Sequence, residues 1–222
     1  MPRATRKTWI ERLLDIPPDS RVYRMTEFER EGFALGWRRI AGVDEAGRGP
    51  LAGPIVAAAV VLGEPIDGLN DSKQLSEGRR ETLFAELERG PHVIGVAIID
   101  PGRIDSVGIQ AANYAAMAEA AAALVPPPDF LLVDGFAIRG CEIPQKRIIK
   151  GDARSLSIAA ASIVAKVTRD RLMVSLHEAY PKYGFDRHKG YGTRAHLDAL
   201  ERNGPCPAHR RSFAPLAAAR QK

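Results

Sequence analysis

Cysteine and long apolar runs are the features that this sequence has least of. Its 222 residues include two cysteines, Cys141 and Cys206, which lie far apart and belong to no Cys-x-x-Cys or Cys/His spacing. This excludes a disulfide framework and gives no zinc-binding pattern, so we expect small buried thiols. No apolar run reaches the roughly 20 residues of a membrane span. The basic start MPRATRKTWIERLL lacks the apolar stretch of a secretion signal, so a cytoplasmic protein without membrane contact is expected.

Positive charge is concentrated near the end of the chain. The whole sequence has a net charge of +5, and the stretch from Lys182 to Lys222 has nine Lys and Arg residues against three acids, a net charge of +6. The rest is therefore close to neutral. A basic stretch of this kind suits a polyanion such as nucleic acid, although a solvated charged face would explain it equally well.

The order of apolar patterns predicts an α/β protein with helices layered on a sheet. Residues 39–44 and 55–62 resemble buried strands joined by a glycine-rich turn, 45–53, which is too short for a crossover helix and so predicts an antiparallel hairpin. Further strands are expected over 92–99, 130–134 and 146–152, and helices over 11–16, 26–33, 76–89, 100–124, 155–178 and 193–203. This divides the chain into an N-terminal extension (1–38), a catalytic core (39–180) and a basic C-terminal helical region (181–222).

Acidic residues follow three of the expected strands. Asp44 and Glu45 come after IAGV, Asp134 after LLV and Asp152 after IIKG. Strand ends of an α/β sheet form a rim where ligands collect, and carboxylates crowded there repel one another unless a cation lies among them. Mg²⁺ and Mn²⁺ prefer oxygen ligands, and two such ions about 4 Å apart can activate a water and stabilise the leaving oxygen in phosphodiester hydrolysis.

Each acid also has a simpler explanation. An Asp-Gly pair after a strand is commonly a turn, and Asp152 could cap the helix that follows it. Side chains alternate along a strand, so Asp44 and Glu45 can serve one site only if the strand ends at Glu45.

The glycine-rich turn carries Gly47, Arg48 and Gly49. Its glycines allow close approach of backbone N–H groups to a ligand, and Arg48 offers a planar donor suited to phosphate. The spacing matches neither dinucleotide-binding nor P-loop patterns. A tight hairpin turn with a surface arginine remains the alternative.

Two further segments could contact a nucleic acid. Asn70, Ser72 and Lys73 lie in a polar loop before a helix, where a phosphate could bind, although a capped loop would look similar. Tyr191 lies between glycines in a basic stretch and could stack on a sugar or base, or simply pack. The spacing of three nearby histidines is not that of metal ligands, so solvated or phosphate-facing roles are expected for His188, His196 and His209.

Taken in order, six segments resemble the successive motifs of bacterial ribonuclease HII: GVDEAGRGPLAGP, LNDSKQLSEGRR, LLVDG, KGDARSLSIAAASIVAKVTRD, YGFDRHKGYGT and HRRSF. The resemblance covers roughly residues 40–216. It implies a ribonuclease H-like fold, in which a central mixed sheet is flanked by helices and followed by a small helical C-terminal part. It also places the family's functional residues: the metal-binding acids fall on Asp44, Glu45, Asp134 and Asp152, the ribonucleotide-sensing turn on Gly47, Arg48 and Gly49, and the junction-reading tyrosine on Tyr191.

The implied reaction is hydrolysis of the RNA strand of RNA/DNA hybrids and cleavage 5′ of ribonucleotides within duplex DNA. It would use two Mg²⁺ or Mn²⁺ ions and leave a 5′-phosphate and a 3′-hydroxyl. Three alternatives stay open: a non-catalytic binder of RNA/DNA hybrids, a ribonuclease HIII-like enzyme that needs runs of ribonucleotides, and another polynucleotidyl transferase on the same fold. We expect a monomer, and the sequence leaves protein partners undetermined.

Two positions depart from the family pattern. Gly108 stands where an acidic, asparagine-containing stretch is common, and Phe136 stands where a polar residue usually follows the Asp-Gly pair. Contacts around Asp134 are therefore expected to differ, while the four acids are retained.

Overall fold

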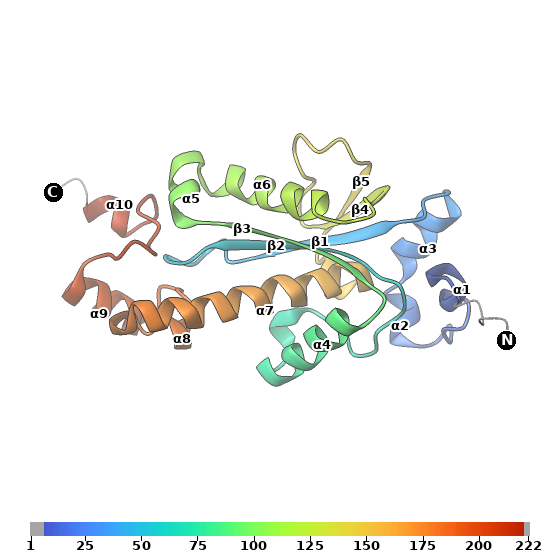
Figure 1. Ribbon diagram of the computed structural model, residues 1–222, viewed down its shortest axis with the longest axis horizontal. Coiled ribbons are helices and arrows are strands. Elements are labelled where there is room, and N and C mark those ends of the chain that lie inside the picture. The colour runs from blue at the N-terminus through green and yellow to red at the C-terminus, as the bar shows by residue number, and fades with distance from the viewer. Residues whose placement is uncertain (1–6, 220–222) are drawn as a thin grey trace.

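The computed structural model, described here for residues 7–219, is a five-stranded mixed sheet with helices on both faces (Figure 1). The strand order is β3-β2-β1-β4-β5. The strands are β1 (Ile40–Ala46), β2 (Ile55–Val61), β3 (Val93–Ile99), β4 (Phe130–Asp134) and β5 (Gln145–Ile148). The expected α/β class and mixed sheet are thus confirmed.

Strand β1 lies in the middle of the sheet and brings the acidic segments together. It forms the predicted antiparallel hairpin with β2, and its pairing runs from Ala41 opposite Val61 to Ala46 opposite Val56. On its other edge it pairs in parallel with β4, but only as far as Val43. Because the hairpin pairing continues to Ala46, the expectation that the strand ends at Glu45 is wrong. The free edge beyond Val43 leaves space next to the end of β4.

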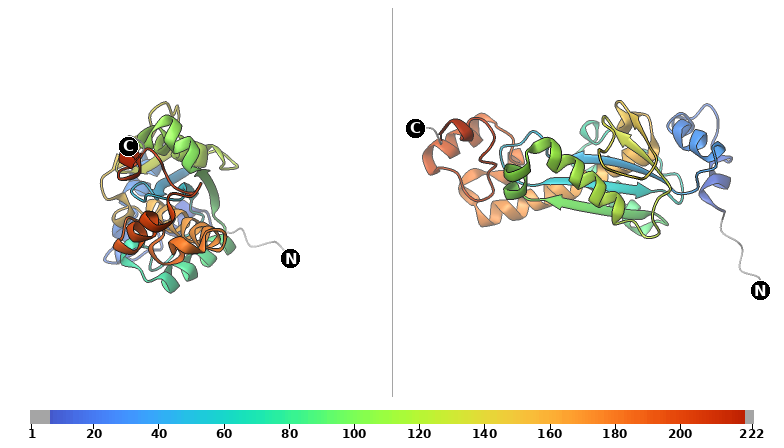
Figure 2. Two further views of the ribbon diagram at one scale, coloured as in Figure 1. Left: turned by 90° about the vertical axis from the view of Figure 1, so that its left-hand side faces the viewer. Right: turned by 90° about the horizontal axis from the view of Figure 1, so that it is seen from above.

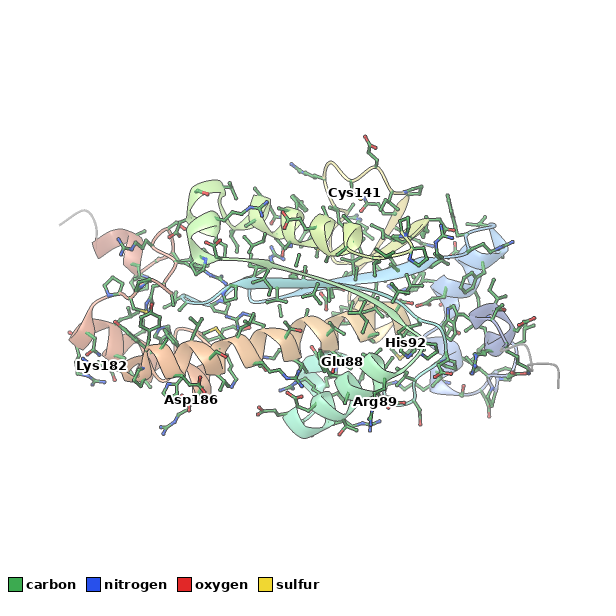
Figure 3. The ribbon with its side chains drawn as sticks, in the orientation of Figure 1. Glu88, Arg89, His92, Cys141, Lys182 and Asp186 are labelled. Atoms are coloured by element: carbon green, nitrogen blue, oxygen red, sulfur yellow. The ribbon has the colours of Figure 1, made fainter. Side chains whose placement is uncertain are left out.

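Helix α7 (Leu156–Ala179) packs along one face of the sheet and α6 (Ile109–Ala122) covers the other. The first ten residues of α7 are buried on all sides, so the helix is more enclosed than a single apolar stripe would make it. Close packing begins at Gly42 of β1, where a Cβ atom would overlap the backbone of Ser157. The side chains of both helix layers fill the space against the sheet (Figure 3). Helix α4 (Glu77–Arg89) lies beside α7 and begins at Ser76, whose hydroxyl accepts from the Arg79 N–H group, as expected of an N-cap.

Besides the end of β1, the segments around Gly108 and Asp152 differ from the sequence expectation. The helix expected over 100–124 is two helices, α5 (Pro101–Val107) and α6, because Gly108 adopts φ +81° and interrupts the helical backbone. The strand expected over 146–152 ends at Ile148, and Asp152 lies in a short 3₁₀ helix, η2 (Gly151–Ala153). Lys150, with φ +54°, turns the chain between them.

The N-terminal and C-terminal helices of the described residues lie at opposite ends of the molecule (Figure 2). At the N-terminal end are α1 (Trp9–Leu13), α2 (Arg21–Arg24) and α3 (Glu27–Ala34). At the other end, the C-terminal lobe contains η3 (Pro181–Tyr183), α8 (Phe185–His188), α9 (Arg194–Asn203) and α10 (Leu216–Ala219), and a further 3₁₀ helix, η1 (Ser72–Gln74), precedes α4. The predicted limits 1–38, 39–180 and 181–222 stay a prediction, and residues 1–6 and 220–222 lie outside the described part.

The sequence expectations about cysteine and membranes can be compared with the described residues. Cys141 and Cys206 are both free thiols, and Cys206 is buried. Within residues 7–219, no helix combines the length and apolar character needed to cross a membrane.

Candidate active site

Three neighbouring elements carry the four acids. Asp44 and Glu45 lie in β1, Asp134 is the last residue of β4, and Asp152 lies in η2. The Oδ1 atom of Asp134 accepts a hydrogen bond of 2.6 Å from the Gly151 N–H group, which ties the end of β4 to the turn that carries Asp152. The parallel pairing of β1 with β4 brings the remaining two acids next to this pair.

These four acids lie close enough together for the charge of one to affect the pKa of another. Burial, together with the charges of Glu45 and Asp134, raises the pKa of Asp44 well above its ordinary value. Burial also raises the pKa of Glu45, and Asp134 adds to the rise while Arg48 opposes it. For Asp152, burial and then the charges of Asp134 and Asp71 raise the pKa. Such a cluster of partly buried carboxylates is unfavourable without a cation.

Lys73 lies close enough to several of these acids for their charges to act on it. Burial opposes its charge, but the carboxylates of Asp44, Asp152 and Asp71 outweigh that effect and raise its pKa. Its position shows that the site attracts positive charge. Oxygen-only donors with mutual repulsion fit Mg²⁺ or Mn²⁺. Among residues 7–219, no three His, Cys, Asp or Glu side chains already form a coordination shell, so binding an ion would need the carboxylates to turn toward it.

A polar hollow of about 370 Å³ is lined by both Asp44 and Glu45. The two acids therefore share a site although the strand continues past Glu45, so the condition expected from the sequence is not needed. The glycine-rich turn forms one wall with Gly47, Arg48 and Gly49, and the exposed ring of Tyr191 lies next to Gly49. Apart from Ala46, the remaining lining is polar or basic and comes from α4, α7 and the loop before α4: Ser72, Lys73, Arg80, Ser162, Lys166 and Arg169. An anionic backbone could therefore lie against the basic side of this hollow while its phosphate faces the acids.

Arg48 has partners that relate to the two departures from the family pattern. Its guanidinium lies over the ring of Phe136 at 5.3 Å and donates to the Gln110 side chain at 3.2 Å, two residues after Gly108. It also forms an ion pair of 3.4 Å with Glu45. Phe136, two residues after Asp134, thus contacts the arginine of the turn. The sequence predicted that contacts near Asp134 would differ from the family pattern, and this contact is of that kind.

Two buried arginines that the sequence patterns did not single out shape the turn. Arg210 donates to the carbonyl oxygens of Gly47 at 2.6 Å, Arg48 at 3.0 Å and Gly53 at 2.9 Å. Arg169 of α7 donates to the carbonyl of Pro54 at 3.0 Å. In the sequence, Arg210 belonged to the basic tail and to the HRRSF segment of the resemblance, but no role was expected for it. Its burial shows that it serves the fold of the turn. A visible signal for Arg169 was the polar spacing Ser162, Lys166, Arg169 on one face of an apolar helix.

Two of the three residues predicted in the loop before α4 line the hollow, and the third does not. Lys73 and Ser72 line the hollow, and the Ser72 hydroxyl is hydrogen-bonded by Ser162 at 2.7 Å. Asn70 does not line the hollow, and its amide donates to the Gln74 side chain at 3.3 Å. Asp71, which was not singled out, faces Asp152 closely enough to raise its pKa. Asp71 stands between Asn70 and Ser72, so its position in the polar loop could have indicated that it lies near the site.

The histidines of the C-terminal lobe are placed differently from the expectation. His196 and His209 are buried, and their Nε2 atoms are 3.0 Å apart. His188 is partly buried and hydrogen-bonded to the Tyr183 carbonyl at 2.7 Å. Solvated or phosphate-facing roles are therefore wrong for His196 and His209, because both rings are buried against Phe185, which meets His196 edge to face and His209 at a tilt.

A second hollow, of about 480 Å³, lies between α9 and the end of the chain. It is mainly apolar, with Leu197, Leu200 and Leu216 in its lining and Glu201 as its acid. One carboxylate beside apolar side chains offers no metal site, so the chemistry belongs to the hollow at β1.

Solved structures define the class of the protein. Its fold is similar to ribonuclease H2 from Pyrococcus horikoshii OT3, with a TM-score of 0.69, 28% identity and coverage of 82% of this chain and 97% of that one. It is also similar to the ribonuclease HII solved in a PCNA:RNase HII complex from Archaeoglobus fulgidus, with a TM-score of 0.66, 28% identity, and coverage of 78% and 93%. Together with the acids at the centre of the sheet, these similarities identify an enzyme with the ribonuclease H-like fold.

Sequence comparison gives the family. The Ribonuclease HII model matches residues 41–216. The chain is 54% identical to ribonuclease HII of Geobacillus kaustophilus over 89% of its own length and 76% of the relative's, and 53% identical to that of Chlamydia trachomatis serovar A over 85% and 88%. The chain belongs to the Ribonuclease HII family, and ribonuclease H endonuclease activity follows from that membership.

Proposed function

We propose that this enzyme hydrolyses the RNA strand of RNA/DNA hybrids and cuts 5′ of single ribonucleotides embedded in duplex DNA, leaving 5′-phosphate and 3′-hydroxyl ends. The observation that carries the proposal is the closeness of the four acids, Asp44, Glu45, Asp134 and Asp152, two of which line a hollow together with the glycines and arginine of the turn. Family membership supports the reaction class, and the site supports the choice of substrate.

The four acids would hold two Mg²⁺ or Mn²⁺ ions. When bound, such ions supply an activated water and stabilise the leaving oxygen. The protein holds Asp134 toward η2 through the Gly151 N–H group, and the buried position of Asp44 keeps its carboxylate at the floor of the site. Lys73, which lies near these carboxylates and lines the hollow, would bind a substrate phosphate.

Selection of a ribonucleotide would depend on the 2′-hydroxyl, the group that distinguishes RNA from DNA at one position. Backbone groups at Gly47 and Gly49 can approach it closely, and Arg48 can donate to the adjacent phosphate. The ring of Tyr191, which is 46% exposed next to Gly49, would stack on the sugar or base at the junction. Asn70, Ser72 and Lys73 would contact phosphates from the loop before α4.

The test is cleavage of a duplex that contains one ribonucleotide. Asp134→Asn keeps the size of the side chain but removes its charge, so we expect at least a hundredfold loss of cleavage with Mg²⁺, in line with losses of metal-site side chains. Glu142→Gln, an exposed acid on the loop after β4, is the matched control and should cut normally. Undiminished cutting by Asp134→Asn would remove that acid from the mechanism.

The same assay separates the alternatives. A non-catalytic hybrid binder would bind the hybrid but would give no cleavage products, whether Mg²⁺ or chelator is present. A ribonuclease HIII-like enzyme would cut a continuous hybrid and leave the single-ribonucleotide duplex intact. Gel filtration alone and with duplex would test the proposed monomer, and fractionation of cells would test the proposed cytoplasmic location.

A further inference from the structure

The segment before Ile40 contributes a buried carboxylate to the start of α7. Glu29, on α3, has no exposed surface. Its Oε1 atom accepts hydrogen bonds from the Ser155 hydroxyl at 2.7 Å and from the Ser157 N–H group at 2.9 Å. Four residues earlier, the Met25 carbonyl accepts from the Leu156 N–H group at 2.8 Å. Helices α2 and α3 lie at the same end of the molecule as the start of α7 (Figure 1).

These contacts complete the N-terminus of the central helix. The first N–H groups of a helix have no partner within it, and here three of them are satisfied in succession. Leu156 donates to Met25, Ser157 to Glu29, and Ile158 to the Ser155 hydroxyl at 3.2 Å. Two of the three acceptors therefore come from the N-terminal segment. A carboxylate is favoured at this end by the dipole of the 24-residue helix.

From Ser155 a short hydrogen-bonded path leads to the acids. The Ser155 N–H group donates to the Gly151 carbonyl at 2.7 Å, and the Gly151 N–H group donates to Asp134 Oδ1 at 2.6 Å. Asp152 lies within this turn. The turn is tightly enclosed, since a Cβ atom on Gly151 would reach the side chain of Ile158. A displacement of the first turn of α7 would therefore move the backbone that carries one acid and holds another.

We propose that Glu29 is a positioning residue of the active site, which fixes Ser155 and the first turn of α7 and thereby sets the geometry of Asp134 and Asp152. This inference rests on the proposed function, because it takes these two acids as metal ligands. It gives the segment before Ile40 a role in the reaction, although the family model matches only from residue 41. Glu29 itself touches neither the substrate nor a metal.

The test compares Glu29→Gln with Glu31→Gln. Glu31 lies on the same helix and pairs with Lys146 at 2.7 Å on the exposed surface, so its loss leaves the start of α7 intact. Binding of Mn²⁺ without substrate is titrated by electron paramagnetic resonance, and the Mg²⁺ dependence and KM of cleavage are measured alongside the melting temperature. For Glu29→Gln we expect roughly tenfold weaker Mn²⁺ binding and a similar rise in the Mg²⁺ needed for half-maximal rate, the lower end of the effect seen for residues that orient metal ligands. Glu31→Gln should match the wild type.

A purely structural role would lower the melting temperature without changing metal affinity. Ser155→Ala removes the hydroxyl that joins Glu29 to the turn. If Glu29→Gln does not fold, the same measurements are made on Ser155→Ala. Wild-type Mn²⁺ affinity in the folded variants would overturn the inference. Failure of the proposed function is distinguishable, because it would appear as normal cleavage by Asp134→Asn, whatever the behaviour of Glu29.

Discussion

Two glycines of the turn after β1 differ in what surrounds them. Gly47 has φ +97°, and a Cβ atom there would overlap the guanidinium of Arg169. Gly49 has an ordinary backbone conformation, and the nearest atom to a Cβ would be Tyr191 Cε1 at 3.9 Å. Gly47 is therefore required by the fold of the turn, while Gly49 is open toward the hollow. Their separate requirements explain how one short turn can be both rigid and accessible to a ligand.

Alanine substitutions should separate these two roles. Gly47→Ala is expected to destabilise the protein by about 1–3 kcal/mol, because it combines an unfavourable φ with a displaced buried arginine. Gly49→Ala should leave the free energy of unfolding nearly unchanged and should reduce cleavage at single ribonucleotides, since its methyl group narrows the approach to the turn. Urea unfolding and the cleavage assay measure the two effects. Equal stability of the two variants would contradict this assignment.

At the scale of elements, the C-terminal lobe holds the turn and Tyr191 in place. Leu51 donates to the Gly190 carbonyl at 2.9 Å, and Arg210 donates from its backbone to the Leu51 carbonyl at 2.8 Å. A chain of hydrogen bonds continues inside the lobe. The Cys206 N–H group donates to His209 Nδ1 at 3.0 Å, so the ring proton of neutral His209 is on Nε2. His209 Nε2 then donates to His196 Nε2, and His196 Nδ1 donates to the Tyr191 carbonyl. Both rings must be neutral to keep this chain.

Stability should therefore fall in mild acid. Burial and the neighbouring His196 lower the pKa of His209 from 6.5 to about 4. As the pH falls, His209 is protonated in the unfolded chain before it is protonated in the folded protein. The contribution of neutral His209 to the free energy of unfolding is therefore fully present above about pH 6.5 and decreases as the pH falls toward 4, by at most about 3 kcal/mol. Urea unfolding of the wild type and of His209→Gln at pH 7 and pH 5 measures this difference, and the variant should lose less. Parallel pH profiles for the two proteins would refute the assignment to His209.

For the whole molecule, the crowded acids lower the stability of the folded state, an effect that a metal ion bound as proposed would relieve. The pKa of Asp44 is raised by burial and by Glu45 and Asp134, so the folded state without metal loses stability as the pH rises through that pKa. Arg210 and Arg169 stabilise the nearby turn but donate to carbonyl oxygens and do not pair with these acids in the hydrogen bonds described. The enzyme thus keeps a destabilising cluster at its centre, as active sites commonly do.

Removing one charge should stabilise the metal-free protein. Asp44→Asn is expected to raise the melting temperature in chelator by a few degrees, corresponding to about 1 kcal/mol, while abolishing cleavage. Mg²⁺ should raise the melting temperature of the wild type at pH 8 more than at pH 5, because protonation competes with the metal, and should have little effect on Asp44→Asn. Asp67→Asn, an exposed acid, is the control. A lower melting temperature for metal-free Asp44→Asn would contradict the repulsion inferred here.

Local patterns in the chain were sufficient to predict the hairpin, the main helices and the candidate acids. Apolar runs reveal strands, so Asp44 and Asp134 could be recognised from the sequence as residues near the ends of buried strands. The end of β1 and the turn around Asp152 were less predictable, because they depend on which neighbouring strand stops first.

Only the tertiary structure decided which polar residues are buried and with whom. Glu29 meets Ser155 across 126 positions of sequence, and Arg210 meets Gly47 across 163. In the sequence both residues stand in charged stretches that are typical of solvent-exposed surface. Such pairs leave no periodic signal in the chain, since their energetic value arises only when folding removes both partners from water.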